Sequence, residues 1–168
     1  MNDQVTQEKK LFMTRLMTPG MANFAGNVHG GTILKLLDEA AFSCASRYCK
    51  MYVMTAALDH VEFKSPITVG DLVTFKCNIN YVGRSSMEVG IRVEGEKIRD
   101  KTKYHAISCY FTMICVNEKG TPQQAPKLQI ESETEQKLFE AGKMRREMRK
   151  ETKERNLQLH VGIDTIIA

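Results

Sequence analysis

The sequence lacks the features that mark several large classes of protein. Its 5 cysteines are scattered, with no CxxC pair and no Cys/His spacing typical of metal ligands. We therefore expect neither a disulfide framework nor a metal site. The cysteines are predicted to be small buried hydrophobes in a reducing compartment.

Long apolar runs and a strong charge imbalance are also missing. No uncharged segment is long enough to span a membrane, and residues 1–10 are polar and lack the apolar core of a signal peptide. The net charge of +4 equals the surplus carried by residues 143–155, so the rest of the chain is close to neutral. We expect a cytoplasmic protein with no membrane partner and no nucleic-acid partner.

A glycine-bearing loop that leads into a long helix is the most informative segment present. Gly30 and Gly31 stand at the start of a largely apolar helix of about 20 residues that runs to Lys50. The N–H groups in the first turn of a helix have no intrahelical partner, and glycines leave them uncovered. This helix entrance is therefore predicted to attract negative charge.

The same helix carries an acid in an unusual position. Viewed down the axis, the other polar side chains gather into one sector: Lys35, Glu39, Ser43, Ser46, Arg47 and Lys50. Asp38 falls outside this sector and points between apolar neighbours: Leu34, Ala41, Phe42 and Ala45. A buried carboxylate costs several kcal/mol unless it is paired, so Asp38 either has a function or reaches the surface or a partner side chain.

The rest of the chain alternates with the period of two that predicts strands. Strands are expected in five ranges: 11–17, 53–64, 71–82, 87–93 and 104–116. Range 104–116 is apolar on both faces, which is typical of a central strand, and the connections before and after range 87–93 are short, which favours antiparallel neighbours. The predicted fold class is α+β, with one long central helix wrapped by an antiparallel sheet of about five strands.

The composition shifts after Pro126. A charged, exposed helix is predicted over 131–155, and Ser132 and Glu135 have the spacing of a capping box. The closing segment 161–167 is apolar enough to dock, at a place that the pattern does not predict. The expected domains are a flexible N-terminus over 1–10, a main domain over 11–128 and a C-terminal helical extension over 129–168.

Four motifs together resemble one known family: Met17-Thr18-Pro19, the run from Asn27 to Leu34, Asp38-Glu39-Ala40 and Gly83-Arg84-Ser85-Ser86. They are similar to the hotdog-fold acyl-CoA thioesterases, of the YciA type and of the brain (cytosolic) acyl-CoA hydrolase type, over residues 12–155. The resemblance implies a hotdog fold and hydrolysis of acyl-CoA to coenzyme A and a carboxylic acid. It implies no cofactor other than the coenzyme A of substrate and product. It also implies a homo-oligomer, with a dimer as the functional unit and a hexamer built as a trimer of dimers.

The family also implies roles for individual residues. Asn27 matches the loop asparagine and Asp38 matches the helix acid, which the two-domain brain enzyme divides between its halves. Asp38 would act as general base or as nucleophile, and both routes stay open. Asn27 would hold the water or the thioester oxygen, while the backbone N–H groups of Gly30 and Gly31 would stabilise charge on that oxygen. His29 is expected to shape the loop.

Coenzyme A carries phosphates, which need cations and donors. Arg84, with Ser85 and Ser86 beside it, is the first candidate for a phosphate contact, and Lys64 is a weaker one. The alternative is a solvated hairpin arginine. Thr55 resembles a threonine that lines the site in the bacterial enzymes, although a plain strand threonine is the other interpretation.

Two other functions fit parts of the pattern. A hotdog dehydratase acting on hydroxyacyl thioesters would pair a histidine with an acid, but this chain has two glycines where that loop is expected. A non-catalytic acyl-CoA sensor would use the basic tail to contact nucleic acid or an acidic membrane. No helix-turn-helix pattern supports it, and glutamates interrupt the basic run.

Overall fold

The computed structural model describes residues 7–159, and the chain divides into two compact units, residues 1–129 and 130–168. The first unit contains, in chain order, β1 (Lys10–Leu16), a short 3-10 helix (Pro19–Met21), α1 (Gly30–Cys49), β2 (Tyr52–Phe63), β3 (Asp71–Val82), β4 (Ser86–Lys97) and β5 (Thr102–Val116). The predicted apolar segment 161–167 lies outside the described residues.

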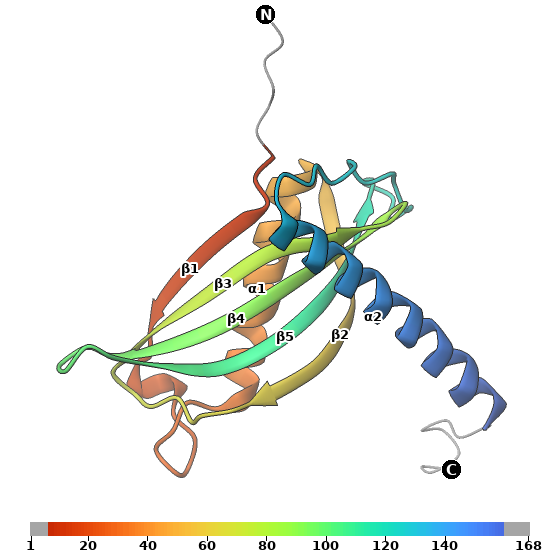
Figure 1. Ribbon diagram of the computed structural model, residues 1–168. Helices are drawn as coiled ribbons and strands as arrows, with labels where there is room; N and C mark the ends of the chain where they lie inside the picture. The colour runs from red at the N-terminus through yellow and green to blue at the C-terminus, as the bar shows by residue number, and fades with distance from the viewer. Residues whose placement is uncertain (1–6, 160–168) are drawn as a thin grey trace, which may run out of the picture. The chain divides into compact units, whose positions relative to one another are not determined.

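The five strands form one antiparallel sheet in the order β1-β3-β4-β5-β2. Helix α1 contacts all five strands, and Figure 1 shows it lying along one face of the curved sheet. This confirms the predicted helix wrapped by an antiparallel sheet. The predicted central strand over 104–116 is β5, which pairs with β4 on one side and β2 on the other, while β4 is the middle strand of the five. β5 leaves its polar alternates Ser108 and Thr112 partly exposed.

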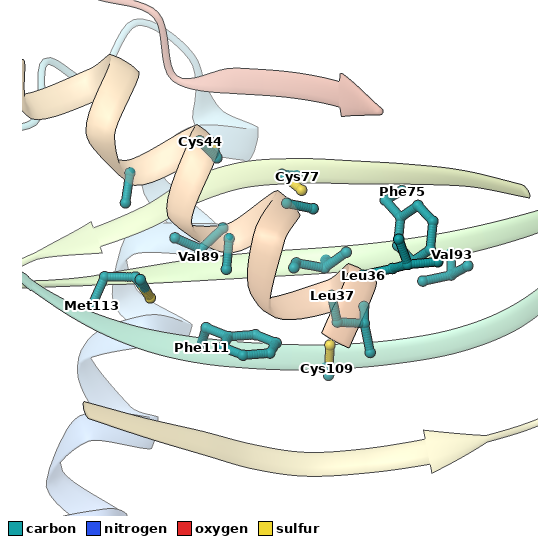
Figure 2. Close-up of a cluster of buried hydrophobic side chains, with 14 of the residues drawn as sticks. Leu36, Leu37, Cys44, Phe75, Cys77, Val89, Val93, Cys109, Phe111 and Met113 are labelled. Atoms are coloured by element: carbon teal, nitrogen blue, oxygen red, sulfur yellow. The ribbon is translucent and has the colours of Figure 1, made fainter. Parts of the chain in front are cut away.

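The core lies between α1 and the sheet. Figure 2 shows Leu37 and Cys44 of α1 facing β3, β4 and β5, which contribute Phe75, Val89 and Phe111. All five cysteines are buried and unpaired, as predicted. A Leu or Phe side chain buried in this way contributes about 1.5–3 kcal/mol, so this packing fixes the position of α1 and of the residues on its exposed side.

Strand β3 departs from simple alternation near its end. The register with β4 shifts between Ile79 and Tyr81, which marks a β-bulge. Asn80 is therefore buried, and its amide donates to Glu88 at 3.2 Å, while the next residue, Tyr81, is half-buried. An extra residue in one strand leaves no trace in a hydrophobic pattern, so the sequence could not show the bulge.

The second unit is built on α2 (Glu133–Gln158). Ser132 Oγ accepts from the Glu135 N–H at 3.2 Å, as the capping box predicts. The Glu135 carboxylate, however, accepts from the N–H of Glu131 at 2.8 Å, one residue before the cap. Within residues 7–159, neither long helix combines the length and the apolarity that a membrane crossing requires.

Candidate active site

The loop before α1 is closed by its own hydrogen bonds. The side-chain oxygen of Asn23 accepts from the N–H groups of Ala25 and Asn27 at 2.9 and 3.1 Å, and the Asn23 N–H donates to the Asn27 carbonyl at 2.7 Å. Gly26 between them has φ +80°, a conformation that favours glycine. We call residues 23–28 the asparagine loop. Because these bonds fasten the two ends of the loop, the Asn23 side chain and the Asn27 backbone have defined positions.

His29 is the N-cap of α1. Its Nδ1 accepts from the Gly31 N–H at 3.0 Å, and a Cβ on Gly31 would lie 3.2 Å from that nitrogen. His29 thus shapes the helix entrance, in line with the prediction. The same bond occupies one of the two N–H groups predicted to stabilise charge. Among residues 7–159 the N–H of Gly30 has no acceptor, so it is the better placed of the two.

A cavity of about 310 Å³ lies at the helix entrance. Its lining includes Asn23, Asn27, Gly30, Phe63, Lys64 and Ile67. The structure therefore brings together three residues that the sequence predicted separately: Asn27, Gly30 and Lys64. The Lys64 ammonium also pairs with Glu62 at 3.2 Å. Asn23 was missed, although an asparagine three residues before a glycine is a turn signal.

Asp38 lies on the exposed side of α1 and has one fixed partner. Thr55 Oγ1 on β2 donates to Asp38 Oδ1 at 2.7 Å. The predicted apolar neighbours Leu34 and Phe42 stand one turn before and one turn after it, 37% and 36% exposed. Within one chain Asp38 is exposed and bonded to Thr55, so it reaches both the surface and a partner side chain, which the sequence left open as alternatives to burial.

The two groups of predicted residues are separate within the chain. Gly30 and Asp38 are eight residues apart, which is roughly 12 Å along an α-helix. Neither Asp38 nor Thr55 lines the cavity. One chain therefore presents two half-sites, the asparagine-loop cavity and the Asp38–Thr55 pair.

Exposed apolar side chains lie on α1 and β2, the two elements that carry the Asp38–Thr55 pair. They are Leu34, Phe42, Tyr52, Met54, Leu58 and Phe63. We call this the α1/β2 surface. The rings of Phe42 and Tyr52 pack edge to face, with their centroids 5.7 Å apart. Strand β2 is 12 residues long and stands at the edge of the sheet, where no strand within residues 7–159 pairs with its outer side. A long apolar edge strand normally has a partner.

The phosphate contacts predicted at Arg84, Ser85 and Ser86 lie elsewhere. Arg84 is exposed in the β3–β4 hairpin, and its carbonyl and that of Ser85 accept from Ala125 and Cys115 at 2.8 and 2.9 Å. Ser86 is in register, across β5, with Met54 of β2. The hairpin therefore stands two strands from the Asp38–Thr55 pair, and it does not line the cavity.

Metal ligation was not predicted. Within the described part of the chain no group of three or more His, Cys, Asp or Glu side chains could hold a metal ion.

Residues 25–101 match the family described as the thioesterase superfamily. The chain is 46% identical to protein VdlD of Helicobacter pylori over 83% of this chain and 80% of that protein. It is 35% identical to the cytosolic acyl coenzyme A thioester hydrolase of Mus musculus over 79% of this chain but only 35% of the longer mouse protein.

Solved structures resemble the chain over most of its length. A hexameric acyl-CoA thioesterase superposes with TM-score 0.82 at 33% identity, covering 86% of this chain and 93% of that one. An acyl-CoA hydrolase from Staphylococcus aureus, in complex with butyryl coenzyme A, coenzyme A and coenzyme A disulfide, superposes with TM-score 0.83 at 27% identity, covering 96% of each.

Alanine variants of the S. aureus hydrolase at an asparagine, an aspartate and a threonine have also been solved. In that enzyme the asparagine precedes the aspartate by fifteen positions and the threonine follows it by seventeen. Asn23, Asp38 and Thr55 have the same two separations in this chain, whereas Asn27 precedes Asp38 by eleven.

Proposed function

Because this chain belongs to the acyl-CoA thioester hydrolases of the thioesterase superfamily, we propose that Asp38 carries out the hydrolysis of an acyl-CoA thioester with help from the asparagine loop. The products are coenzyme A and a carboxylic acid. The observation that carries the proposal is the pair of half-sites. A carboxylate held by Thr55 and a polar cavity at a helix N-terminus stand apart in one chain, and each lacks what the other supplies.

The proposed steps of hydrolysis follow from the chemistry of a thioester. Asp38 either removes a proton from a water that attacks the carbonyl carbon, or attacks that carbon itself and forms an anhydride that water then hydrolyses. In both routes negative charge develops on the carbonyl oxygen, and the C–S bond breaks as the coenzyme A thiolate leaves. The Gly30 N–H at the positive end of α1 is a suitable donor to that oxygen, and such a donor is typically worth about 3 kcal/mol of barrier.

A second copy of the chain brings the half-sites together in this proposal. The α1/β2 surface lies on the two elements that carry Asp38 and Thr55 and includes the outer edge of β2, so pairing two copies there would cover the apolar side chains. In a two-fold dimer each of the two sites would combine Asp38 of one chain with the asparagine loop of the other. The hexameric relative supports further assembly of such dimers into a hexamer.

Two asparagines can supply the side-chain amide that holds the water or the thioester oxygen. Both Asn27 and Asn23 line the cavity. The matching separations favour Asn23, and its oxygen is already engaged by two backbone N–H groups, which leaves the amide nitrogen as donor. Asn27 remains the second candidate.

Asn23→Asp keeps the oxygen acceptors of the loop and removes the donor, and Asn27→Asp is its matched control. We expect the Asn23 variant to lose the larger share of kcat in a thiol-release assay. The reverse order would assign the role to Asn27.

Coenzyme A binding is proposed at the β3–β4 hairpin. Arg84 is an exposed cation, and Ser85 and Ser86 add hydroxyl groups beside it. Lys64 is a second cation at the cavity mouth, weakened by its pairing with Glu62. The mouse relative named as cytosolic supports a cytoplasmic location.

Thiol release from a series of acyl-CoA substrates tests the assignment of Asp38. We expect Asp38→Asn to lose at least about a hundredfold in kcat, because the reacting carboxylate is removed. Glu39→Gln is the matched control, since Glu39 is the next residue and pairs only with Lys35 at 3.9 Å on the exposed face. An Asp38→Asn enzyme with parental kcat would remove Asp38 from the mechanism.

A further inference from the structure

Asp71 at the start of β3 is a buried acid for which the proposed mechanism has no role. It is 4% exposed. Its Oδ2 accepts three hydrogen bonds: from the Thr68 N–H at 3.0 Å, from Thr68 Oγ1 at 2.8 Å and from the Tyr104 hydroxyl at 2.6 Å. A buried carboxylate with this many donors is fixed in place, and it fixes its donors in turn.

The first pair of donors closes a tight turn. The Asp71 N–H donates back to the Thr68 carbonyl at 3.2 Å, so residues 68–71 form a turn held by both backbone and side chain. Gly70 at its third position has φ +91°, as a type II turn requires. The conformation of Thr68 is thus set by the Asp71 carboxylate.

The turn is joined directly to the asparagine loop. Thr68 and Asn27 form an antiparallel β-bridge, and the Val28 N–H donates to the Ile67 carbonyl at 2.8 Å. Ile67 also lines the cavity beside Asn27. The wall of the cavity formed by residues 65–67 therefore continues into the Asp71 turn.

Tyr104 on β5 completes the arrangement from the other side. Its ring crosses Gly95 of β4, where a Cβ would lie 2.2 Å from the ring and 2.4 Å from the hydroxyl. Glycine at position 95 is thus needed for space. The hydroxyl reaches Asp71 only because the middle strand has no side chain at this point.

We propose that Asp71 is a positioning residue. Its carboxylate, held by the Tyr104 hydroxyl, fixes Thr68 and thereby sets the position of the asparagine loop at the cavity. This inference rests on the proposed role of that loop in the hydrolysis. The asparagine amide acts on the reacting group, so a loop displaced by a fraction of an ångström loses kcat more than substrate binding.

Single variants give the first test, with the full-length enzyme and the acyl-CoA that the parent turns over fastest. Tyr104→Phe removes only the hydroxyl, and Asp71→Asn removes the charge. We expect each to lower kcat about tenfold with KM changed less than about twofold. Asp100→Asn is the matched control, because Asp100 also holds a turn, accepting from the Thr102 N–H at 2.9 Å, but lies in the β4–β5 hairpin. It should keep the parental kcat.

A double-mutant cycle separates positioning from general stability. If Asp71 acts through the loop, Asp71→Asn costs about tenfold in the parent and almost nothing when Asn23→Asp is already present. An equal loss in both backgrounds, or parental kcat in both Asp71→Asn and Tyr104→Phe, overturns the inference.

Failure of the proposed role of the asparagine loop gives a different result from failure of the role of Asp71. If the two loop variants, Asn23→Asp and Asn27→Asp, both keep parental kcat, the asparagine loop has no catalytic role, and the proposed action of Asp71 through it falls with that result. If Asp71→Asn does not fold, the same cycle is run with Tyr104→Phe.

Discussion

At the scale of single residues, the hydrogen bond from Thr55 to Asp38 determines which way the carboxylate points. Its length of 2.7 Å is that of a well-formed O–H···O hydrogen bond. The bond keeps one oxygen of Asp38 occupied and leaves the other available for a water or a thioester carbon. Thr55 is therefore expected to act on catalysis through Asp38.

Replacing Thr55 by valine tests this role. Valine keeps the branched shape and loses the hydroxyl, and a hydrogen bond to a charged group is worth about 1.5–3 kcal/mol, so kcat should fall roughly tenfold or more. Thr55→Ser keeps the hydroxyl and should stay within about threefold of the parent. Thiol-release kinetics measure both. Equal kcat for the two variants would mean that the bond has no part in turnover.

Asp71 gives a second prediction at this scale, for the pH dependence of stability. Burial alone would raise the pKa of Asp71, but hydrogen bonds from Tyr104 and Thr68, with the charge of Lys97, hold that pKa below its usual value. A lowered folded-state pKa adds stability above the unfolded value of about 3.9, and this stability is lost as the pH falls through the folded-state pKa.

The difference between the parent and Asp71→Asn should therefore be largest near neutral pH and shrink as the pH falls below about 4. Urea unfolding at a series of pH values measures it. A difference that grows toward acid pH would contradict this account.

Candidate site residues could be identified from the sequence where they belong to a local motif. Asp38 stood out because it left the polar sector of its helix, and Gly30 because it opened that helix. Asp71 and Asn23 did not stand out, because their partners, Tyr104 and the cavity wall, are brought to them only by the folded sheet and loop. Partners that lie far apart in the sequence leave no local pattern, so such contacts cannot be predicted from it.

At the scale of elements, the entrance of α1 depends on His29 and Gly31 together. The imidazole accepts from an N–H of the first turn, and it packs so closely on Gly31 that a Cβ there would lie 3.2 Å from its Nδ1. The two residues form one structural feature, and the sequence alone does not show their contact.

Gly31→Ala should therefore displace the cap and destabilise the protein by about 1 kcal/mol, the usual cost of losing an N-cap. His29→Ala should cost about the same, and the two changes combined should cost little more than either. Gly20→Ala is the control, since a Cβ added at Gly20 would meet no other atom within 4 Å. Chemical denaturation measures the change, and fully additive losses would show that the two residues act independently.

The elements themselves were largely predictable, because one amphipathic helix and five alternating segments have distinct periods. What the periods could not show was local geometry. The bulge at Asn80 and the extension of β4 to Lys97 arise from backbone pairing with both neighbouring strands, which holds polar residues such as Glu94 and Glu96 in the ladder.

At the scale of the whole molecule, the proposed active site requires two chains. The Asp38–Thr55 pair lies within the exposed α1/β2 surface, and the asparagine loop lies roughly 12 Å away along α1. Sequence patterns within one chain could not show this division, because the contacts that complete a site would be made between copies.

Mixing two variants, each defective in one of the two half-sites, tests whether a complete site is shared between two chains. Asp38→Ala and Asn23→Asp chains, carrying different tags and produced together, pair at random, so about half of the dimers are mixed and each mixed dimer has one complete site. We expect recovery of about a quarter of the parental thiol-release activity, while either variant alone keeps only a small residual activity. Mixed dimers no more active than the two separate variants would contradict the two-chain site, because both residues would then have to serve the same site from a single chain.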